Sequence, residues 1–281
     1  RTQGRRRPSR IDAAWIAVLL LSSLAALPLL LNAGLPNGDD VLYHAYRAGE
    51  MQRAWAQGLL APRWADGTYF GYGSPLWHFY APLSYWLSAA TMTLTGMSAL
   101  DALRLLILGC FLGMGTGMLR FARTQSGAVG GVLAATAYVF SPYLLFTLPY
   151  ARAAYPEMLA LALLPWLFAR FEVLLRRSGG REVFLATGVF FTMVVAHNLL
   201  ATLSALLLAL WLIWNAVAST VAASPSERRM ALHPYLRAAL SYGLGLALSA
   251  FFWLPILLEG DSVRLENLTG ISLLDYSNHF V

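Results

Sequence analysis

The sequence contains no lysine and only one cysteine, and charged residues make up just 12% of its 281 positions. With the single thiol of Cys110 the chain cannot form an internal disulfide, so cysteine usage does not indicate a redox compartment. The low charge, 58% hydrophobic residues and a mean hydropathy of +0.57 exclude an ordinary soluble domain. The composition therefore predicts a membrane protein.

Alternation of apolar and polar residues is also missing, which excludes a transmembrane β-barrel. Apolar residues instead come in blocks, and many blocks approach the roughly 20 residues that a membrane-spanning helix needs. We therefore expect an all-α polytopic membrane protein. The triplet Gly113, Gly115 and Gly117 lies within one block and predicts close helix packing.

All 20 basic residues are arginine, and the net charge is +6. Nucleic-acid binding is one interpretation, but in a membrane protein topology explains the arginines better, so we expect no nucleic-acid partner. A compositional bias accounts for the missing lysine. Arginine also suits phosphate, because its paired N–H groups match phosphate oxygens.

The chain begins with five arginines in its first ten residues, followed by an apolar run over 11–31. This pattern predicts a first transmembrane helix whose N-terminus is cytoplasmic. A signal peptide is the alternative interpretation. The run is long for a signal peptide and no small-residue cleavage site follows cleanly, so we favour the membrane anchor.

Seven more apolar segments follow the first. If all of them cross, the arginines near residues 120 and 177 lie outside, against the positive-inside rule. If 76–94 does not cross, these arginines lie inside. That segment is rich in His, Tyr and Trp, a composition typical of the membrane interface. We therefore expect seven spans and one juxtamembrane or re-entrant segment. The seven later segments are 76–94, 102–119, 128–148, 157–175, 183–196, 199–221 and 238–258.

With seven spans, three segments meet at the outer face: the stretch 37–80 within a first outer loop of about 32–100, the loop 149–157, and the hairpin at 197–198. The transmembrane module then covers 1–258. The acidic tail 259–281 is also outside and starts a segment that we expect to continue in a longer native chain.

The stretch after the first span predicts a helix starting at Val41 that lies on the membrane surface. At about 100° per residue, one face is polar and another apolar. His44 follows Asp40 by one turn and could orient it or share its proton. The polar face carries Asp40, His44 and Arg47, and the apolar face carries Val41, Ala45, Ala48 and Trp55.

Three acids at the outer face are candidates for chemistry. Asp39 and Asp40 follow the first span directly, where partial desolvation raises a carboxyl pKa toward that of a general base. They could equally cap the helix that follows. Glu157 comes after Pro156 in the first turn of a span, where it could serve a substrate or simply complement the helix dipole.

Basic and aromatic groups near these acids could bind a lipid phosphate. Arg63 and Arg152 lie outside beside aromatic residues, and they could hold a phosphate or anchor the protein in lipid headgroups. His197 lies at a hairpin tip, where a packing role is the default. Asp40, His44 and Glu157 could ligate a metal, but no tight pattern such as H-E-x-x-H is present. No cofactor is certain, and a divalent metal stays open.

Short motifs that are weak singly and more specific together run from the first outer loop to the fourth span. They are Asp40-Val-Leu-Tyr-His44-Ala-Tyr-Arg47, Gly58, Pro62-Arg63-Trp64, Tyr72-Gly73-Ser74-Pro75, Phe79-Tyr80-Ala81-Pro82-Leu83, Ser141-Pro142-Tyr143, Arg152 and Pro156-Glu157.

Together these motifs resemble bacterial membrane proteins of the pyruvoyl-tetrahydropterin-synthase-related group, which is similar to the GT-C superfamily of polyprenyl-phosphate-sugar-dependent glycosyltransferases. The resemblance reaches from the first span to about residue 259. It implies a core of seven spans with amphipathic juxtamembrane helices in the first outer loop. It also implies a catalytic acid after the first span, matched better by Asp40 than by Asp39, and a second acid at Glu157. The chain departs from the family because no D-x-D or E-x-D pair stands in the second loop.

The sequence thus leads to an inverting membrane glycosyltransferase of the plasma (inner) membrane, acting at its outer face on a polyprenyl-phosphate-linked sugar. A non-catalytic subunit that scaffolds a protein complex is the first alternative, and a lipid or sugar transporter is the second. The predicted catalytic residues are Asp40, Glu157, Asp39 and His44, and the predicted substrate- or phosphate-binding residues are Arg63, Arg152, Arg47, His78, Tyr80 and His197.

Overall fold

The computed structural model describes residues 12–32, 36 and 38–262. Within these ranges the chain is helical, with a single isolated bridge between Ala65 and Ser74 as its only β-type pairing, so the predicted all-α class is confirmed. The first ten residues and the predicted outer segment from 263 onward lie outside the described residues. The helices are α1 (Ala13–Leu31), α2 (Val41–Ala56), η1 (Tyr69–Gly71), α3 (Leu76–Phe79), α4 (Leu83–Thr95), α5 (Ala99–Val139), η2 (Tyr143–Arg152), α6 (Tyr155–Arg176), α7 (Gly180–Val194), α8 (Asn198–Ala222), α9 (Arg228–Leu248), α10 (Ala250–Leu258) and η3 (Gly260–Ser262).

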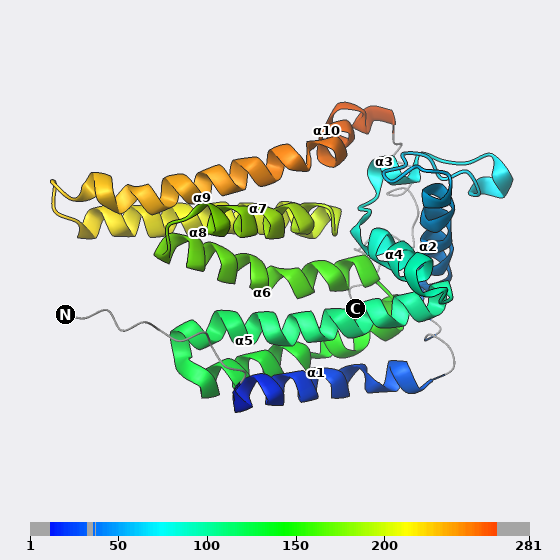
Figure 1. Cartoon of the computed structure of the whole chain (residues 1–281), viewed down its shortest axis with the longest axis horizontal. Coiled ribbons are helices and arrows are strands. Elements are labelled where there is room, and N and C mark those ends of the chain that lie inside the picture. Colours follow the sequence, from blue (N-terminus) through cyan, green and yellow to red (C-terminus); the bar gives the residue numbers. More distant parts are fainter. Residues whose placement is uncertain (1–11, 33–35, 37, 263–281) are drawn as a thin grey trace, which may run out of the picture.

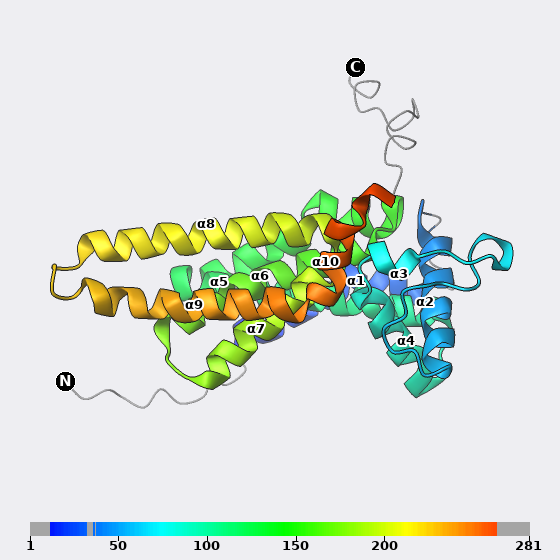
Figure 2. The same ribbon diagram turned by 90° about the horizontal axis from the view of Figure 1, so that it is seen from above.

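The long helices α1, α5, α6, α7, α8 and α9 lie along one common axis, whereas α2 stands across that axis at one end, beside α3 and α4 (Figure 1). The view from above shows the same separation (Figure 2). We call the end that carries α2, α3 and α4 the loop end. The opposite end, where α6 turns into α7 and α8 into α9, is the turn end.

Helix α5 is not straight but folds back on itself at Gly127, whose φ of 73° and ψ of −171° are not helical. A straight helix would separate residues 115 and 135 by about 30 Å. Both positions nevertheless lie against the same part of α1: a Cβ on Gly115 would be 2.1 Å from Ser22, and Ala135 packs against Val18. The two arms of α5 correspond to the separate apolar segments 102–119 and 128–148 of the sequence.

Small residues set how closely the helices approach. A Cβ on Gly117 would lie 2.6 Å from the ring of Trp166 on α6. The same indole donates a hydrogen bond of 3.0 Å from Nε1 to the carbonyl of Gly113. The prediction that the glycine triplet allows close helix packing is therefore confirmed.

Four helical stretches of the described chain are each long and apolar enough to cross a membrane, and a fifth is obtained if α9 and α10, bent by 68°, count as one. One of the four, Ala99–Arg152, is the folded-back pair of arms. Helix α4, with 13 residues, is too short to cross, since about 20 are needed. These helices make the chain a multi-pass membrane protein.

The two ends of the bundle differ in charge, as the sequence predicts. At the turn end, Arg123 pairs with Asp12, which caps α1, and Arg176 pairs with Glu172. Arginines dominate this end and acids dominate the loop end. The other arginines at the turns are Arg120, Arg177, Arg181, Arg228 and Arg229, and the acids at the loop end are Asp39, Asp40, Glu50, Asp66, Asp101, Glu157, Glu259 and Asp261.

In the first outer loop, segment 76–94 is divided between two helices, because α3 ends at Phe79 and Tyr80 adopts an extended conformation before Pro82 precedes α4. One prediction about this loop is corrected. The predicted faces of α2 are wrong for His44, which is only 1% exposed and lies on the buried face with Ala48. This imidazole can be buried because Tyr85 supplies a hydrogen-bond partner, described below.

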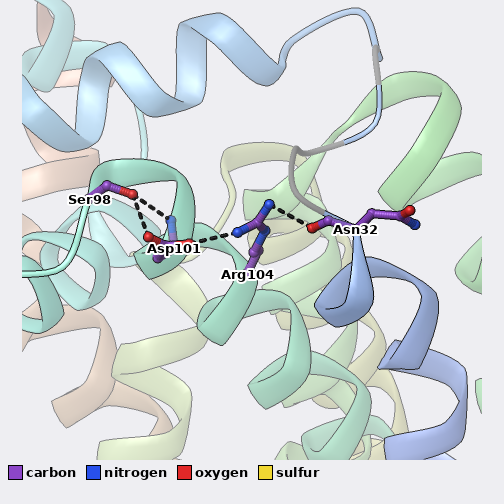
Figure 3. Close-up of polar contacts among 4 residues, drawn as sticks. All are labelled: Asn32, Ser98, Asp101 and Arg104. Carbon is purple, nitrogen blue, oxygen red and sulfur yellow. Dashed lines mark hydrogen bonds and ion pairs between the residues drawn. The ribbon is translucent and has the colours of Figure 1, made fainter.

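Arg104 joins the start of α5 to the end of α1 (Figure 3). Its guanidinium donates to the carbonyl of Asn32 at 2.8 Å and to the carboxylate of Asp101 at 2.7 Å. Asp101 in turn accepts a 2.7 Å bond from Ser98, the N-cap of α5. The last carbonyls of a helix have no partner within it, so a cation there is favourable.

We therefore expect Arg104→Ala to lower the free energy of unfolding by about 1–3 kcal/mol, because the helix-end carbonyl and the carboxylate both lose a charged donor. Thermal unfolding of the purified protein in detergent measures this. The control is Asp101→Asn, which removes the charge pair but keeps the bond to Asn32 and should cost less. Equal losses in both variants would show that the bond to Asn32 contributes nothing.

Candidate functional site

The three segments that the sequence predicts at one face do meet at the loop end. The backbone N–H groups of Asp39 and Asp40 donate to the carbonyls of Ala151 at 3.0 Å and Arg152 at 3.3 Å. The α3–α4 junction is held on the α7–α8 turn, where Leu83 N–H donates to the carbonyl of Val195 at 3.0 Å. The Asn198 amide also donates to the carbonyl of Phe79 at 2.8 Å. This meeting is confirmed.

Both candidate acids after α1 are exposed. Asp40 occupies the N-cap position of α2, but its side chain makes no capping hydrogen bond. The sequence left open whether these acids merely cap the helix, and for Asp40 the geometry gives no support to that interpretation. The close approach depends on Gly38, because a Cβ there would lie 2.6 Å from the carbonyl oxygen of Tyr150.

Glu157 is held by two groups of the neighbouring segment η2. Tyr143 donates its hydroxyl proton to one carboxylate oxygen at 2.5 Å, and Arg152 donates to the other at 2.9 Å. Arg152 also contacts the Tyr143 hydroxyl at 2.8 Å. The Glu157 side chain is 13% exposed and that of Arg152 is 49% exposed. Glu157 and Arg152 therefore neutralise each other.

His197 lies next to this pair at the start of α8. Its Nδ1 accepts a bond of 3.3 Å from the N–H of Leu200, so the imidazole caps the helix. Burial lowers its pKa, the Glu157 carboxylate opposes that shift, and Arg152 adds to it. The cap fixes the proton on Nε2 when the ring is neutral.

The buried His44 side chain belongs to a cluster that the sequence did not reveal. Its Nδ1 is 2.7 Å from the hydroxyl of Tyr85, and its ring also packs against Tyr155 with 5.1 Å between ring centres. Arg47 contacts the same hydroxyl at 3.4 Å and lies over the Tyr80 ring, 4.3 Å from its centre. The cluster connects α2 to α4, because His44 and Arg47 of α2 both contact Tyr85 of α4. Tyr85 itself is completely buried.

Burial first, and the nearby Arg47 second, lower the pKa of His44 to about 3. In the unfolded chain this histidine has an ordinary pKa and is protonated below about pH 6.5. In the folded chain it stays neutral at the same pH. This contribution to stability is complete above pH 6.5 and is lost as the pH falls toward 3. The slope approaches about 1.4 kcal/mol per pH unit.

As the pH is lowered from 7 to 4.5, the unfolding temperature should therefore decrease more steeply for the wild type than for His44→Gln, because glutamine takes up no proton. The matched control is His233→Gln, because His233 is exposed on α9. A pH dependence that His44→Gln leaves unchanged would mean that His44 is not the group responsible.

The loop end also contains a chain of three side chains that connects segments far apart in sequence. Arg63 donates to Nδ1 of His78 at 3.0 Å, and Nε2 of His78 lies 3.0 Å from the carboxylate of Glu259. The contact with Glu259 is one of distance and charge, because Nε2 of His78 forms no hydrogen bond with a described residue. The predicted residues Arg63 and His78 are thus brought together, whereas Glu259 was not foreseen.

The residues proposed as metal ligands do not fit a metal. Nδ1 of His44 is engaged by Tyr85, and both carboxylate oxygens of Glu157 already accept hydrogen bonds. In the part of the chain that the structure describes, no three His, Cys, Asp or Glu side chains gather as a metal site would require. No step of the chemistry is therefore assigned to a metal.

The fold and the site define a multi-pass helical membrane protein with a polar, aromatic-rich assembly at one end of its bundle. The chain belongs to the family described as the 6-pyruvoyl-tetrahydropterin synthase related domain, a membrane protein family that matches residues 77–276. This confirms the group that the motifs resemble. A comparison with curated proteins gave no match.

Proposed function

We propose that the chain is a membrane glycosyltransferase of the GT-C type that transfers a sugar from a polyprenyl phosphate to an acceptor at the loop end. The observation that carries this proposal is the backbone pairing of the Asp39–Asp40 turn with the segment that bears Arg152 and leads to Glu157. It sets two acidic segments side by side where the bundle ends. Membership in the membrane protein family is compatible with it.

The proposal includes seven crossings. The two arms of α5 count separately, α7 counts although it has only 15 residues, and α9 with α10 counts once. This parity leaves α2, η2 and the α7–α8 turn on one side. The arginine-rich turn end then lies in the cytoplasm and the loop end lies outside the plasma (inner) membrane, as the positive-inside rule favours.

In the proposed reaction, Asp40 takes the proton from an acceptor hydroxyl as that oxygen attacks the anomeric carbon. The bond between this carbon and the phosphate oxygen breaks, and the phosphate leaves with the electron pair. A single displacement inverts the configuration. Asp39 provides a second exposed carboxylate beside the base.

Arg63 is the better of the two arginines for the leaving phosphate. Arg152 is engaged by the Glu157 carboxylate, whereas the described partner of Arg63 is an imidazole. A cation near the leaving oxygen stabilises the charge that develops there. Glu157 holds η2 in place through Arg152, and His44 orients α2 through Tyr85.

The test uses the purified chain in lipid vesicles, radiolabelled polyprenyl-phosphate sugars and a panel of hydroxyl acceptors. Transfer to a product with inverted linkage is the expected result. If no donor of the panel is consumed while the protein stays folded, the enzymatic proposal fails. Activity that needs an added divalent ion would contradict the metal-free mechanism.

One observation favours the scaffold alternative. The loop between Ala65 and Ser74 presents Tyr69, Phe70 and Tyr72 with exposed fractions of 72%, 103% and 87%. Large aromatic groups presented to solvent are typical of protein–protein interfaces. The test changes Tyr69, Phe70 and Tyr72 to serine together. If this variant loses a partner protein that co-purifies with the wild type, and neither protein transfers sugar, the scaffold alternative is established. The transporter stays last, because the ionisable groups gather at the two ends.

A further inference from the structure

A cavity of about 210 Å³ lies beside the candidate site, enclosed by the first outer loop, α3, α4 and α10. Arg63 and His78 line its polar side, and the rings of Trp77, Trp86 and Phe251 line its apolar side. The bend of 68° between α9 and α10 brings Phe251 over Trp86, with 6.2 Å between the stacked rings. The cavity therefore exists because α10 turns back onto the first outer loop.

Trp77 and Trp86 line this cavity with their rings, and their indole N–H groups are closed off from it. Nε1 of Trp77 and Nε1 of Trp86 are buried, and neither bonds to any described residue. Trp77 is only 4% exposed, so water outside the protein does not serve it. An indole N–H and a guanidinium can only donate. The guanidinium of Arg63 and the two tryptophan rings thus suit a ligand that has acceptor oxygens and an apolar ring face.

An apolar groove of about 340 Å³ runs between α8 and the α9–α10 pair. It adjoins the cavity at Phe252, which lines both. Leu206 and Leu257 on its two sides are 57% and 71% exposed, so the groove opens along the apolar flank of the bundle. A hydrocarbon chain in this groove would place its polar head at the cavity.

We propose that the cavity and this groove form one binding site for a sugar-phosphate lipid. The sugar lies against Trp77 and Trp86, the phosphate binds Arg63, and the lipid chain occupies the groove between α8 and α10. The inference rests on the proposed function and names the path by which the donor reaches the site. The cavity holds about seven water volumes, enough for one sugar residue and too little for the chain.

A second apolar groove, of about 610 Å³ between α4 and α5, offers the competing position for a chain. It shares no lining residue with the cavity. Thr91 lines that groove and Thr202 lines the proposed one, and each hydroxyl donates to the carbonyl four residues earlier. A tryptophan in place of Thr91 or of Thr202 would fill the groove that this threonine lines. The two variants therefore serve as matched controls for each other.

The experiment measures dissociation constants of the purified full chain by native mass spectrometry in detergent. The probes are citronellyl phosphates carrying mannose, glucose, arabinose or N-acetylglucosamine, together with citronellyl phosphate and the four sugar 1-phosphates. At least one conjugate should bind about tenfold or more tightly than either of its halves, because one site holds both. If no conjugate does so, the proposal is wrong.

The variants locate the two halves of the probe. Trp77→Leu and Trp86→Leu remove the aromatic faces that line the cavity, and they should weaken binding of the conjugate about tenfold without affecting citronellyl phosphate. Thr202→Trp should weaken the binding of both the conjugate and citronellyl phosphate. Thr91→Trp should weaken the binding of neither. Unfolding temperatures confirm that each variant is folded.

The reverse pattern, in which Thr91→Trp abolishes binding and Thr202→Trp does not, would overturn the proposed path. Unchanged binding in both tryptophan-to-leucine variants would overturn the sugar position. Binding is measured without transfer, so the two proposals fail separately. If the probes bind as expected but no sugar is transferred, only the glycosyltransferase proposal is rejected. If the two tryptophan variants transfer sugar as fast as the wild type, only the proposed binding site is rejected.

Discussion

Asparagine in place of Asp40 should lower sugar transfer by a factor on the order of 10²–10⁴, the usual contribution of a general base. An amide has nearly the shape of the carboxylate but cannot take the acceptor proton. Asparagine caps a helix as well as aspartate does, and Asp40 makes no capping bond in any case. The loss should therefore appear in the rate of the chemical step and not in the unfolding temperature.

The control for this prediction is the neighbouring acid. Asp39→Asn removes the same charge one residue earlier, at a carboxylate that is also exposed. It should reduce transfer far less than Asp40→Asn, as measured by initial rates with a labelled donor in vesicles. Full transfer by Asp40→Asn would show that the base has been assigned wrongly, and a larger loss in Asp39→Asn would move the role to that residue.

Charge and apolar periodicity were enough to predict the general arrangement. Positive-inside parity predicts that the Asp39–Asp40 turn, the Arg152 loop and the His197 turn lie together, and the backbone bonds of the structure confirm it. Apolar blocks also predicted both arms of α5. The sequence cannot show whether seven helices cross, because the four or five stretches selected by length and composition count the two arms of α5 once and leave out α7.

Side-chain partners could not be predicted, because they depend on contacts between distant segments. Position along α2 placed His44 beside Asp40, yet burial of the α2–α4 interface turns it toward Tyr85, 41 residues away. The pairing of His78 with Glu259 arises only because α10 bends back over α3. No local pattern encodes that bend, so the cavity between Trp77, Trp86 and Phe251 was also missed.

Gly38→Ala should reduce transfer by about 10²-fold while leaving both acids in place. The added Cβ would lie 2.6 Å from the carbonyl oxygen of Tyr150 and 3.1 Å from that of Ala151, so the Asp39–Asp40 turn must move away from η2. A displacement of about 1 Å at a reacting group costs on the order of 10²-fold in rate. Gly38 does not adopt a left-handed conformation, so alanine meets a steric obstacle there and no backbone strain.

Gly49→Ala is the matched control, because a Cβ at this position of α2 meets nothing within 4 Å. It should keep full transfer and stabilise the protein by up to about 1 kcal/mol, since alanine favours a helix interior over glycine. Rates and unfolding temperatures of both variants are measured side by side. If Gly38→Ala transfers sugar as fast as Gly49→Ala does, the contact between the turn and η2 does not position the catalytic acid, and the proposed site loses its main support.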